Sequence, residues 1–569
     1  MKKNVMALSI AAMIGGLGFA SSALAGVIAG TGAAVDATTI ATDGKMAARD
    51  ATGLAVAEGG VGHALVVPYY NAQNGNMTVL HVTNTDQANG KLVKVRFRSA
   101  SNSDDVLDFQ VFMSPGDVWT AAVMAGADGV ANIITADNTC TVPALTKNVA
   151  QPFVQTRLPS YADAATKANL TREGYVEIFN MADITNVTAW TADGTASAAG
   201  TQRSPLYTAT KHVNGTAPCS VAGSAARTLV DTIATTSFTT EAAAAQRGLQ
   251  TPTTGLMGDW YIINVPQTTT FSGAATAIQL TGGTRGNFVH FPQLDTPAVA
   301  VTADANTLTA DPLFRTTQVV TNANAAPTSV PALALLNFDL PDMSTPFYAA
   351  PGAAAPLAQA QALQAALRVN SVTNQYANDA VISAKTDWVF SMPTRRYNVA
   401  ANYAAGTTLA LATASTQYRL FSDLGAGGHA DDMFYPAQAG APIEAGNTSV
   451  DANGNICVRA DSQKFFDREE TTGSTVPVFS PGTSTSVQFC GEVSVLAFRD
   501  TGTSVLGASV ARRTVTTGSY ENGWGVLNTA NGGKGLPILG ASFIKLENPQ
   551  ASAGKAGTYG ITWPHRFTK

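Results

Sequence analysis

The fold class follows from residues 65–84, which read LVVPYYNAQNGNMTVLHVTN. The stretch begins with an apolar run and then contains Asn74-Gly75, the dipeptide most typical of a tight turn between antiparallel strands. After this turn, residues 77–84 alternate between two faces with the two-residue period of a β-strand. The stretch therefore predicts a β-hairpin.

Further short strands follow at intervals of about 8–14 residues, a spacing typical of a β-sandwich or a closed sheet. Along residues 91–98, Lys94, Arg96 and Arg98 lie on the face opposite to the apolar side chains, which we expect to point inward. The other strands are predicted at residues 106–112, 117–123, 174–179, 260–265, 287–291, 387–392, 487–498 and 536–546.

Helical signals are few. A helix is predicted near 356–368, where Pro356 precedes a face formed by Leu357, Ala360, Leu363 and Leu367. A run of four alanines within 239–248 predicts a second, shorter helix, and the polar segments 185–228 and 296–331 are expected to be long loops. The predicted fold is mainly β, with two or more antiparallel β-sandwich (Ig-like) domains, long loops and one or two short helices.

The first 25 residues combine Lys2-Lys3, an apolar stretch and Ala23-Leu24-Ala25, the pattern of a secretory signal peptide. The alternative is an N-terminal membrane anchor, but the apolar run is short and interrupted by glycine. We expect residues 1–25 to be this signal, 26–60 an N-terminal arm, 61–325 an N-terminal β-sandwich region and 326–569 a C-terminal β-rich region. The protein is thus expected to be secreted, at the surface of a Gram-negative bacterium or outside it, without a transmembrane anchor.

The composition excludes several classes of protein. Charged residues make up only 13% of the 569-residue chain, with 34 Lys+Arg against 39 Asp+Glu, so nucleic acid is not an expected partner. Hydrophobic residues make up 45% of the chain, which is too many for an intrinsically disordered protein. The surface is expected to be wetted mainly by uncharged polar side chains.

Four cysteines are widely spaced, and none forms a CxxC pair. In an oxidising compartment we expect neighbours in the sequence to pair, as Cys140–Cys219 and Cys457–Cys490, although four cysteines allow three connectivities. Each bond would add roughly 3–4 kcal/mol to stability in the chain-entropy model.

Local motifs of catalysis are missing from the sequence. It contains no G-x-S-x-G, no H-E-x-x-H, no P-loop and no dinucleotide-binding fingerprint. We therefore predict no catalytic residues and no enzymatic activity. Carboxylates that are distant in the sequence can still meet in a fold, so a hydrolase stays open.

Two acidic clusters are candidate calcium sites, and calcium is the one candidate cofactor. The first contains Asp104, Asp105 and Asp108, for which the alternative is a cap on a loop between strands. The second contains Asp451, Asn453 and Asn455 and begins like an EF-hand loop. It has Ser462 where the twelfth position needs Glu, so an Asn-Gly turn is the alternative.

Exposed tryptophans are candidates for stacking against sugars. Trp119, Trp260 and Trp388 lie within apolar strand patterns and are expected in the core. Trp190 and Trp524 lie in polar or glycine-rich surroundings and are the candidate glycan-stacking residues.

Residues 66–123 contain the sequences VVPYY, NG, VTNT, KVRF, VLDF and SPGDVWTA, and residues 174–177 and 386–389 read GYVE and TDWV. This pattern resembles an uncharacterised family of exported proteobacterial cell-surface proteins. The low-charge composition, rich in Thr and Ala, is similar to that of bacterial surface-layer (S-layer) proteins. Neither resemblance supplies a catalytic residue.

These observations lead to three functional hypotheses. The first is a structural cell-surface protein that assembles with itself into a surface layer or extracellular array. The second is a secreted adhesin or glycan-binding protein that uses Trp190 or Trp524, with cell-envelope glycan as the candidate partner. The third is a secreted hydrolase.

Overall fold

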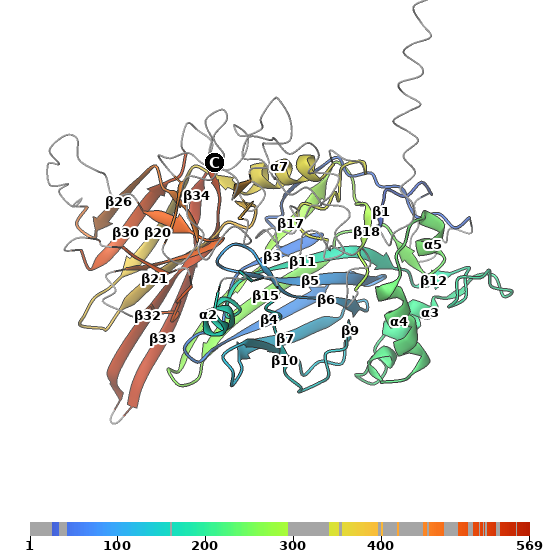
Figure 1. Cartoon of the computed structure of the whole chain (residues 1–569), viewed down its shortest axis with the longest axis horizontal. Helices are drawn as coiled ribbons and strands as arrows, with labels where there is room; N and C mark the ends of the chain where they lie inside the picture. The colour runs from blue at the N-terminus through green and yellow to red at the C-terminus, as the bar shows by residue number, and fades with distance from the viewer. Residues whose placement is uncertain are drawn as a thin grey trace, which may run out of the picture.

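The computed structural model describes residues 26–33, 43–156, 158, 159, 162–293, 341–351, 355–395, 400, 401, 418, 419, 448–451, 455–470, 487–498, 504–510, 512–515, 517, 520–530, 535–552 and 555–569. This part of the chain is mainly β, and its paired strands are antiparallel except for one parallel pair (Figure 1). Residues 1–25 and residue 325, where we predicted a signal peptide and a boundary, lie outside the described residues.

The larger N-terminal sheet has eight strands in the order β2-β17-β3-β11-β5-β6-β9, with β14 paired to β11. Strand β5 is central, and all of its residues are buried. The bounds are β2 Gly53–Val56, β3 Ala64–Asn71, β5 Gly90–Ser99, β6 Asp105–Met113, β9 Cys140–Val142, β11 Glu173–Ile184, β14 Leu249–Gln250 and β17 Thr276–Thr281.

A six-stranded sheet has the order β10-β8-β7-β4-β15-β16. Its strands are β4 Asn76–Asn84, β7 Val118–Ala125, β8 Ala131–Ile134, β10 Gln151–Pro152, β15 Leu256–Asn264 and β16 Thr269–Ala274. The predicted N-terminal arm contains strand β1 (Gly26–Ile28), which pairs with β18 (Phe288–His290), and also contains β2.

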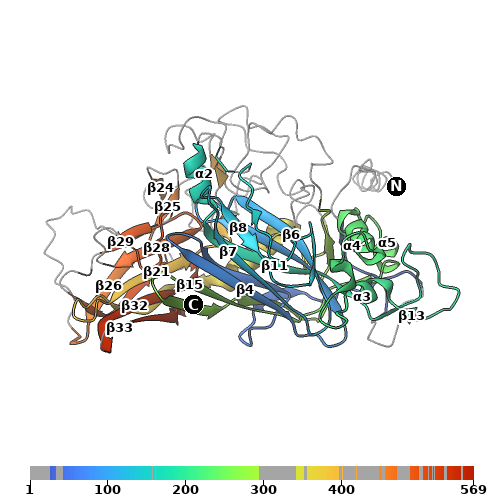
Figure 2. The same cartoon turned by 90° about the horizontal axis from the view of Figure 1, so that it is seen from below.

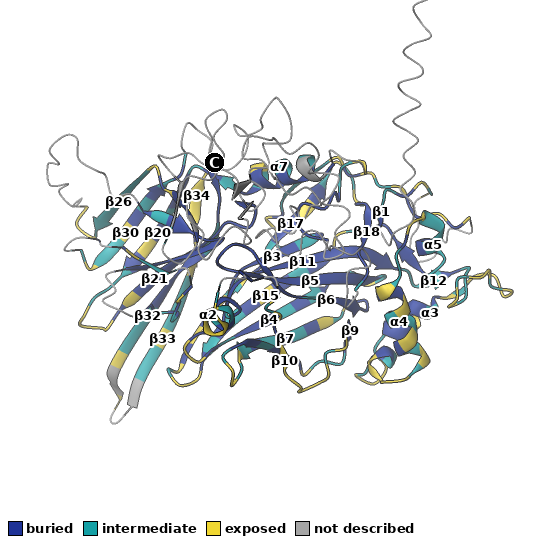
Figure 3. Ribbon diagram, in the orientation of Figure 1, coloured by how far each residue is buried: buried dark blue, intermediate teal, exposed yellow. Residues whose placement is uncertain are grey.

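The apolar faces of these two sheets form one core. Strand β3 of the larger sheet contacts β4, β7 and β15 of the smaller one. Between the sheets, the ring of Trp119 on β7 lies 5.5 Å from that of Phe109 on β6, centroid to centroid. Trp119 and Trp260 are almost fully buried, which confirms that they belong to the core. Strands β5 and β11 are likewise buried along their length (Figure 3).

The Asn74-Gly75 turn forms, but the hairpin predicted around it is wrong. Both residues have positive φ, and the N–H of Asn76 donates to the carbonyl of Gln73, as in a tight turn. Strands β3 and β4 nevertheless belong to different sheets. The hydroxyl of Thr78 accepts from the N–H of Asn71 and donates to its carbonyl, so a side chain replaces the strand pairing where the chain crosses between layers.

Helix α7 (Ala355–Leu367) and helix α5 (Glu241–Ala245) confirm the two predicted helices. The prediction of only one or two helices is wrong, because the described residues also contain α2 Ala164–Leu170, α3 Pro205–Thr210 and α4 Ala225–Thr235. Ser204 and Ser224 cap α3 and α4 by accepting backbone N–H bonds, and both caps lie in the segment expected to be a loop. None of the described helices combines the length and the apolar character needed to cross a membrane.

The C-terminal strands form separate ladders. A five-stranded sheet has the order β29-β28-β21-β32-β33, a four-stranded sheet β26-β30-β20-β34 and a three-stranded sheet β24-β25-β27. Their bounds are β20 Ser371–Ala377, β21 Lys385–Ser391, β24 Thr448–Val450, β25 Ile456–Arg459, β26 Ser462–Asp467, β27 Gln488–Cys490, β28 Val493–Phe498, β29 Arg512–Val515, β30 Asn522–Asn528, β32 Leu539–Ser552, β33 Lys555–Pro564 and β34 Arg566–Thr568.

A second core, around the buried Trp388, joins the five-stranded and four-stranded sheets. The ring of Trp388 lies 4.7 Å from that of Phe498, which confirms the core position predicted for this tryptophan. Short two-stranded pairs complete the described strands, namely β12 Val187–Thr188 with β13 Gln202–Arg203, β19 Arg368–Val369 with β31 Leu536–Pro537, and β22 Ala400–Ala401 with β23 Tyr418–Arg419.

Buried carboxylates hold residues 504–510 between the two halves of the chain. Glu173 on β11 accepts the backbone N–H groups of Ser509 and Val510 at 2.7 and 3.1 Å. From the other side, Asp387 on β21 accepts the N–H of Leu506 at 3.0 Å. The N-terminal core also includes apolar residues of β21, β28 and β32, so the two halves share packed surface. Helices α3, α4 and α5 lie at the far end from the C-terminal sheets (Figure 2).

We expect Glu173→Gln to change the pH dependence of stability. Burial raises the pKa of Glu173, although the bonds from Ser509 and Val510 act in the opposite direction. A pKa above the unfolded value of about 4.3 means that wild-type stability falls as pH rises through the folded pKa. The free energy of unfolding of Glu173→Gln, minus that of wild type, should therefore increase with pH above about 4, as measured by urea unfolding.

The control is Glu173→Leu, which leaves the N–H groups of Ser509 and Val510 without their acceptor. It should lower the free energy of unfolding by at least about 2 kcal/mol. A Gln-minus-wild-type difference that does not vary with pH would show that the carboxylate does not pay a burial penalty.

Candidate functional site

A large groove lies where the N-terminal and C-terminal regions meet. It encloses about 800 Å³ and is lined by β2, by the last turns of α7 and by the residues around β34. Most lining side chains are small or apolar, among them Ala55, Ala362, Ala366, Ile538 and Phe567. The volume lies within the range of about 300–1,000 Å³ typical of ligand sites.

Strand β2 forms one edge of the eight-stranded sheet, and this edge faces the groove. It pairs with β17 on one side and with no other described strand on the other. Hydrogen bonding in this antiparallel pair alternates, and the N–H of Ala57 donates to the carbonyl of Ala277. By that alternation the peptide groups of Gly53 and Ala55 face β17, and those of Leu54 and Val56 face outward.

The groove contains few polar groups. His565 is buried between two partners, with Nε2 2.8 Å from the carbonyl of Val389 and Nδ1 2.9 Å from the Asn374 amide. Burial lowers the pKa of His565 to about 4, so this ring is neutral at pH 7 and holds its neighbours in place. Among the described lining residues Glu58 is the one acidic side chain and Lys569 the one lysine. The groove therefore suits an apolar ligand or a peptide backbone better than acid–base chemistry.

Trp524 lies on the outer face of the four-stranded sheet and is 40% exposed. Its ring stacks on that of Phe466, the residue directly opposite on β26, with centroids 4.2 Å apart and planes 10° apart. Gln375 is opposite Trp524 on the other neighbour, β20, and it is exposed. We call Trp524, Phe466 and Gln375 the aromatic platform.

The second tryptophan candidate lies elsewhere in the molecule. Trp190 is half-buried and forms a β-bridge with Ala196, and its carbonyl accepts the side-chain amide of Gln202 at 2.9 Å. Trp190 follows β12, in the N-terminal region, so the structure does not bring it together with Trp524.

The first acidic cluster lies against the cations of β5. Asp105 accepts from Arg96, and Asp108 accepts from Lys94. Burial acts to raise the pKa of Asp108, but the charges of Lys94 and Arg96 outweigh it and lower the pKa to about 2. Asp104 is buried in the turn before β6. Calcium at this cluster stays a prediction, and any ion there would share its carboxylates with these cations.

Two further cations of β5 are buried, Arg98 on the same face as Lys94 and Arg96, and Lys91 on the opposite face. Arg98 contacts Glu177 at 3.2 Å and Asp342 at 3.3 Å, and both carboxylates are fully buried. Lys91 contacts Asp183 at 2.7 Å. The basic residues that alternate with the apolar ones thus face a second interior layer and not solvent.

The second acidic cluster forms a turn next to a disulfide. The N–H of Asp451 donates to the carbonyl of Asn455 between β24 and β25, and the side chain of Asp451 pairs with Arg513. Asn453 lies outside the described residues. The guanidinium of Arg513 also contacts Cys490 Sγ, so a cation already lies beside Asp451 and this sulfur.

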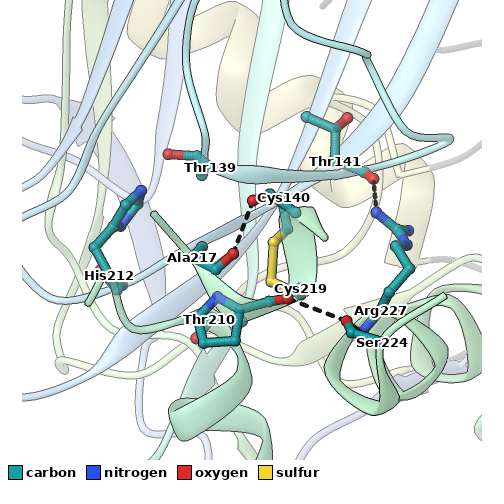
Figure 4. Close-up of a disulfide and its surroundings, with 12 residues drawn as sticks. Thr139, Cys140, Thr141, Thr210, His212, Ala217, Cys219, Ser224 and Arg227 are labelled. Carbon is teal, nitrogen blue, oxygen red and sulfur yellow. Dashed lines mark hydrogen bonds between the residues drawn. A yellow bond between two sulfur atoms is a disulfide. The ribbon is translucent and has the colours of Figure 1, made fainter. Parts of the chain in front are cut away.

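The cysteines pair as Cys140–Cys219 and Cys457–Cys490, the connectivity expected from their order in the sequence. Cys457 and Cys490 lie opposite each other on β25 and β27. The other bond ties strand β9 to the short helix before α4 (Figure 4). Beside it, the guanidinium of Arg227 donates to the carbonyl of Thr141 at 2.9 Å, so two links fasten this helical cluster to the larger sheet.

Sequence reasoning missed Phe466, the groove and the buried role of the β5 cations. Phe466 lies among the charged residues of 464–470, and its pairing with Trp524 depends on strand register. For the cations a signal was present, because Lys94, Arg96 and Arg98 alternate and Asp105 and Asp108 follow on the next strand. Matched charges on consecutive strands indicate cross-strand pairing.

We expect Arg98→Met to lower the free energy of unfolding by about 3–5 kcal/mol, because Glu177 and Asp342 would stay buried without this cation. The measurement is urea unfolding at pH 7. Lys464→Met, which removes an exposed cation from β26, is the control and should stay within about 0.5 kcal/mol of wild type. Equal effects of the two substitutions would contradict the interior position of Arg98.

No family model, curated protein or solved structure matches this chain.

Proposed function

We propose that this chain is an exported structural protein of the bacterial cell surface that assembles with itself into a layer or extracellular array. The observation that carries the proposal is the outer edge of β2, which pairs with no strand of the described part of the chain and borders an apolar groove beside α7. Natural proteins protect such edges with charge, proline, bulges or a covering element, because an open edge templates pairing with another chain. Strand β2 reads GLAV and carries none of these side chains.

Export is part of the proposal. The first 25 residues have the pattern of a signal peptide, and two disulfides suit an oxidising compartment. Low overall charge reduces the repulsion between copies that an array has to overcome. In this proposal, Ig-like sandwich domains are the units of the array. The resemblance to exported proteobacterial proteins is a further part of the proposal. A secreted hydrolase remains the third hypothesis, without an observation in its favour.

The purified mature protein is expected to form ordered sheets or filaments as its concentration rises. Electron microscopy and analytical ultracentrifugation, with and without divalent cations, measure this directly, and isolated envelopes should show the same repeat. A protein that stays monomeric at high concentration with divalent cations present would overturn the proposal.

A second function, binding of a cell-envelope glycan, is favoured by the aromatic platform. Trp524 offers an exposed ring that is held in position by stacking on Phe466, and Gln375 supplies hydrogen-bonding groups at its side. An aromatic face flanked by polar groups is suited to the apolar face and the hydroxyls of a sugar.

For this second function, Trp524→Ala should weaken binding to envelope polysaccharide by up to about tenfold, the loss expected for one aromatic contact. Trp563→Ala is the matched control, since Trp563 is 41% exposed on a different sheet. Binding is measured by isothermal titration with polysaccharide fragments. Unchanged affinity in Trp524→Ala, or no binding by wild type, would reject the glycan function.

A further inference from the structure

Strands β32 and β33 continue past the sheet that holds their base. Strand β21 pairs with β32 only from Leu539 to Lys545, whereas β32 and β33 pair with each other as far as Ser552 and Lys555. Beyond Glu547, whose N–H donates to the carbonyl of Ile382, the two strands form a ribbon with no third described strand. In Figure 1 the ribbon runs to the lower left, away from α7, which lines the groove.

A two-stranded ribbon is marginally stable on its own in water, so a ribbon of this kind gains stability from a third strand. Along β33, successive peptide groups face β32 and the outer edge in turn. The hydrogen bond from the N–H of His565 to the carbonyl of Gly540 shows which residues face β32. By that alternation the peptide group of Thr558 faces the outer edge of the ribbon. Neither this edge nor the outer edge of β2 pairs with a further strand within the described residues, so both present backbone donors and acceptors of the same kind.

The two edges also match in size and chemistry. The four residues of β2 extend about 13 Å at roughly 3.3 Å per residue. Strand β33 lies against β16 at Gly560 and Thr562, so the part beyond this contact is residues 555–559, which extend about 17 Å. Gly557 and Thr558 are small residues that fit beside the alanines of α7 in the groove. Because the ribbon points away from the groove of its own chain, the strand that enters has to come from another copy.

We propose that the β32–β33 ribbon of one copy inserts into the groove of the next copy, where β33 adds as a strand to the outer edge of β2. This inference rests on the proposed self-assembly and specifies which two surfaces join neighbouring copies. Backbone hydrogen bonds from Leu54 and Val56 supply the pairing, and the small apolar lining of the groove supplies the buried surface. The contact joins two different surfaces of the same chain, so it repeats from copy to copy and builds an open assembly.

Two proline variants test the contact. Val56→Pro removes the outward N–H of β2, and Thr558→Pro removes the outward N–H of β33, while the bonds to β17 and β32 are kept. Each variant alone should stay monomeric in analytical ultracentrifugation and electron microscopy. Their mixture should form dimers only. The intact ribbon of Val56→Pro enters the intact groove of Thr558→Pro, and the groove and the ribbon that remain exposed on this dimer are the altered ones. The matched controls, Val56→Thr and Thr558→Val, keep the N–H groups and should assemble like wild type.

Amide hydrogen exchange on wild type supplies a readout that needs no variant. On assembly the amides of Leu54 and Val56 should become protected, whereas those of Gly53 and Ala55, which already face β17, should change little. If wild type assembles but the proline variants assemble equally well and these amides stay unprotected, the inference is wrong and self-assembly stands. A wild type that remains monomeric overturns both.

Discussion

Strand β5 carries four cations that have no access to solvent, and neutralising them determines what packs around the larger sheet. A buried charge without a partner is strongly destabilising, so every cation of β5 needs a carboxylate within contact distance. Lys94 finds Asp108 on the next strand, and Arg98 finds Glu177 on β11. Arg98 also contacts Asp342, which lies far along the chain, so the segment after residue 340 is drawn onto the face of this sheet. The polar face of β5 is therefore an interior layer that fixes long-range contacts as firmly as the apolar core does.

The groove lies beside the junction of the two halves of the chain, and buried carboxylates hold this junction together as well. Glu173 and Asp387 accept backbone N–H groups of one loop from opposite sides, so this loop sets how close the N-terminal and C-terminal sheets can come. Apolar residues of β21, β28 and β32 then pack into the N-terminal core. At the groove, α7 contacts both β2 and the C-terminal strand β31. The site is thus a consequence of the junction and not of any local motif.

Periodicity predicted the strands because a half-buried strand records its environment in its own residues. Strands β3 to β7 and helix α7 were visible in this way, as was the buried position of Trp119 and Trp388. Pairing was not visible, since Asn74-Gly75 determines a turn but not whether its flanking strands share a sheet. Helix α3 was missed because its signal is a capping serine and it is only six residues long, whereas α4 has an apolar face with Val230, Ile233 and Ala234 that its periodicity records. The groove and the aromatic platform depend on contacts between residues distant in the sequence, which a single sequence does not encode locally.

Open strand edges are normally a hazard, so their surroundings indicate whether they are used. A protein selected to stay monomeric would place a lysine or a proline in β2, where one substitution is enough to block pairing. This chain keeps β2 uncharged and lines the adjacent groove with alanines, while it places its cations inside, on β5. It also extends β32 and β33 beyond the sheet that supports them. An uncharged strand edge and a ribbon without a third described strand are each unfavourable in a monomer, and the proposed contact between copies would pair the two and remove both.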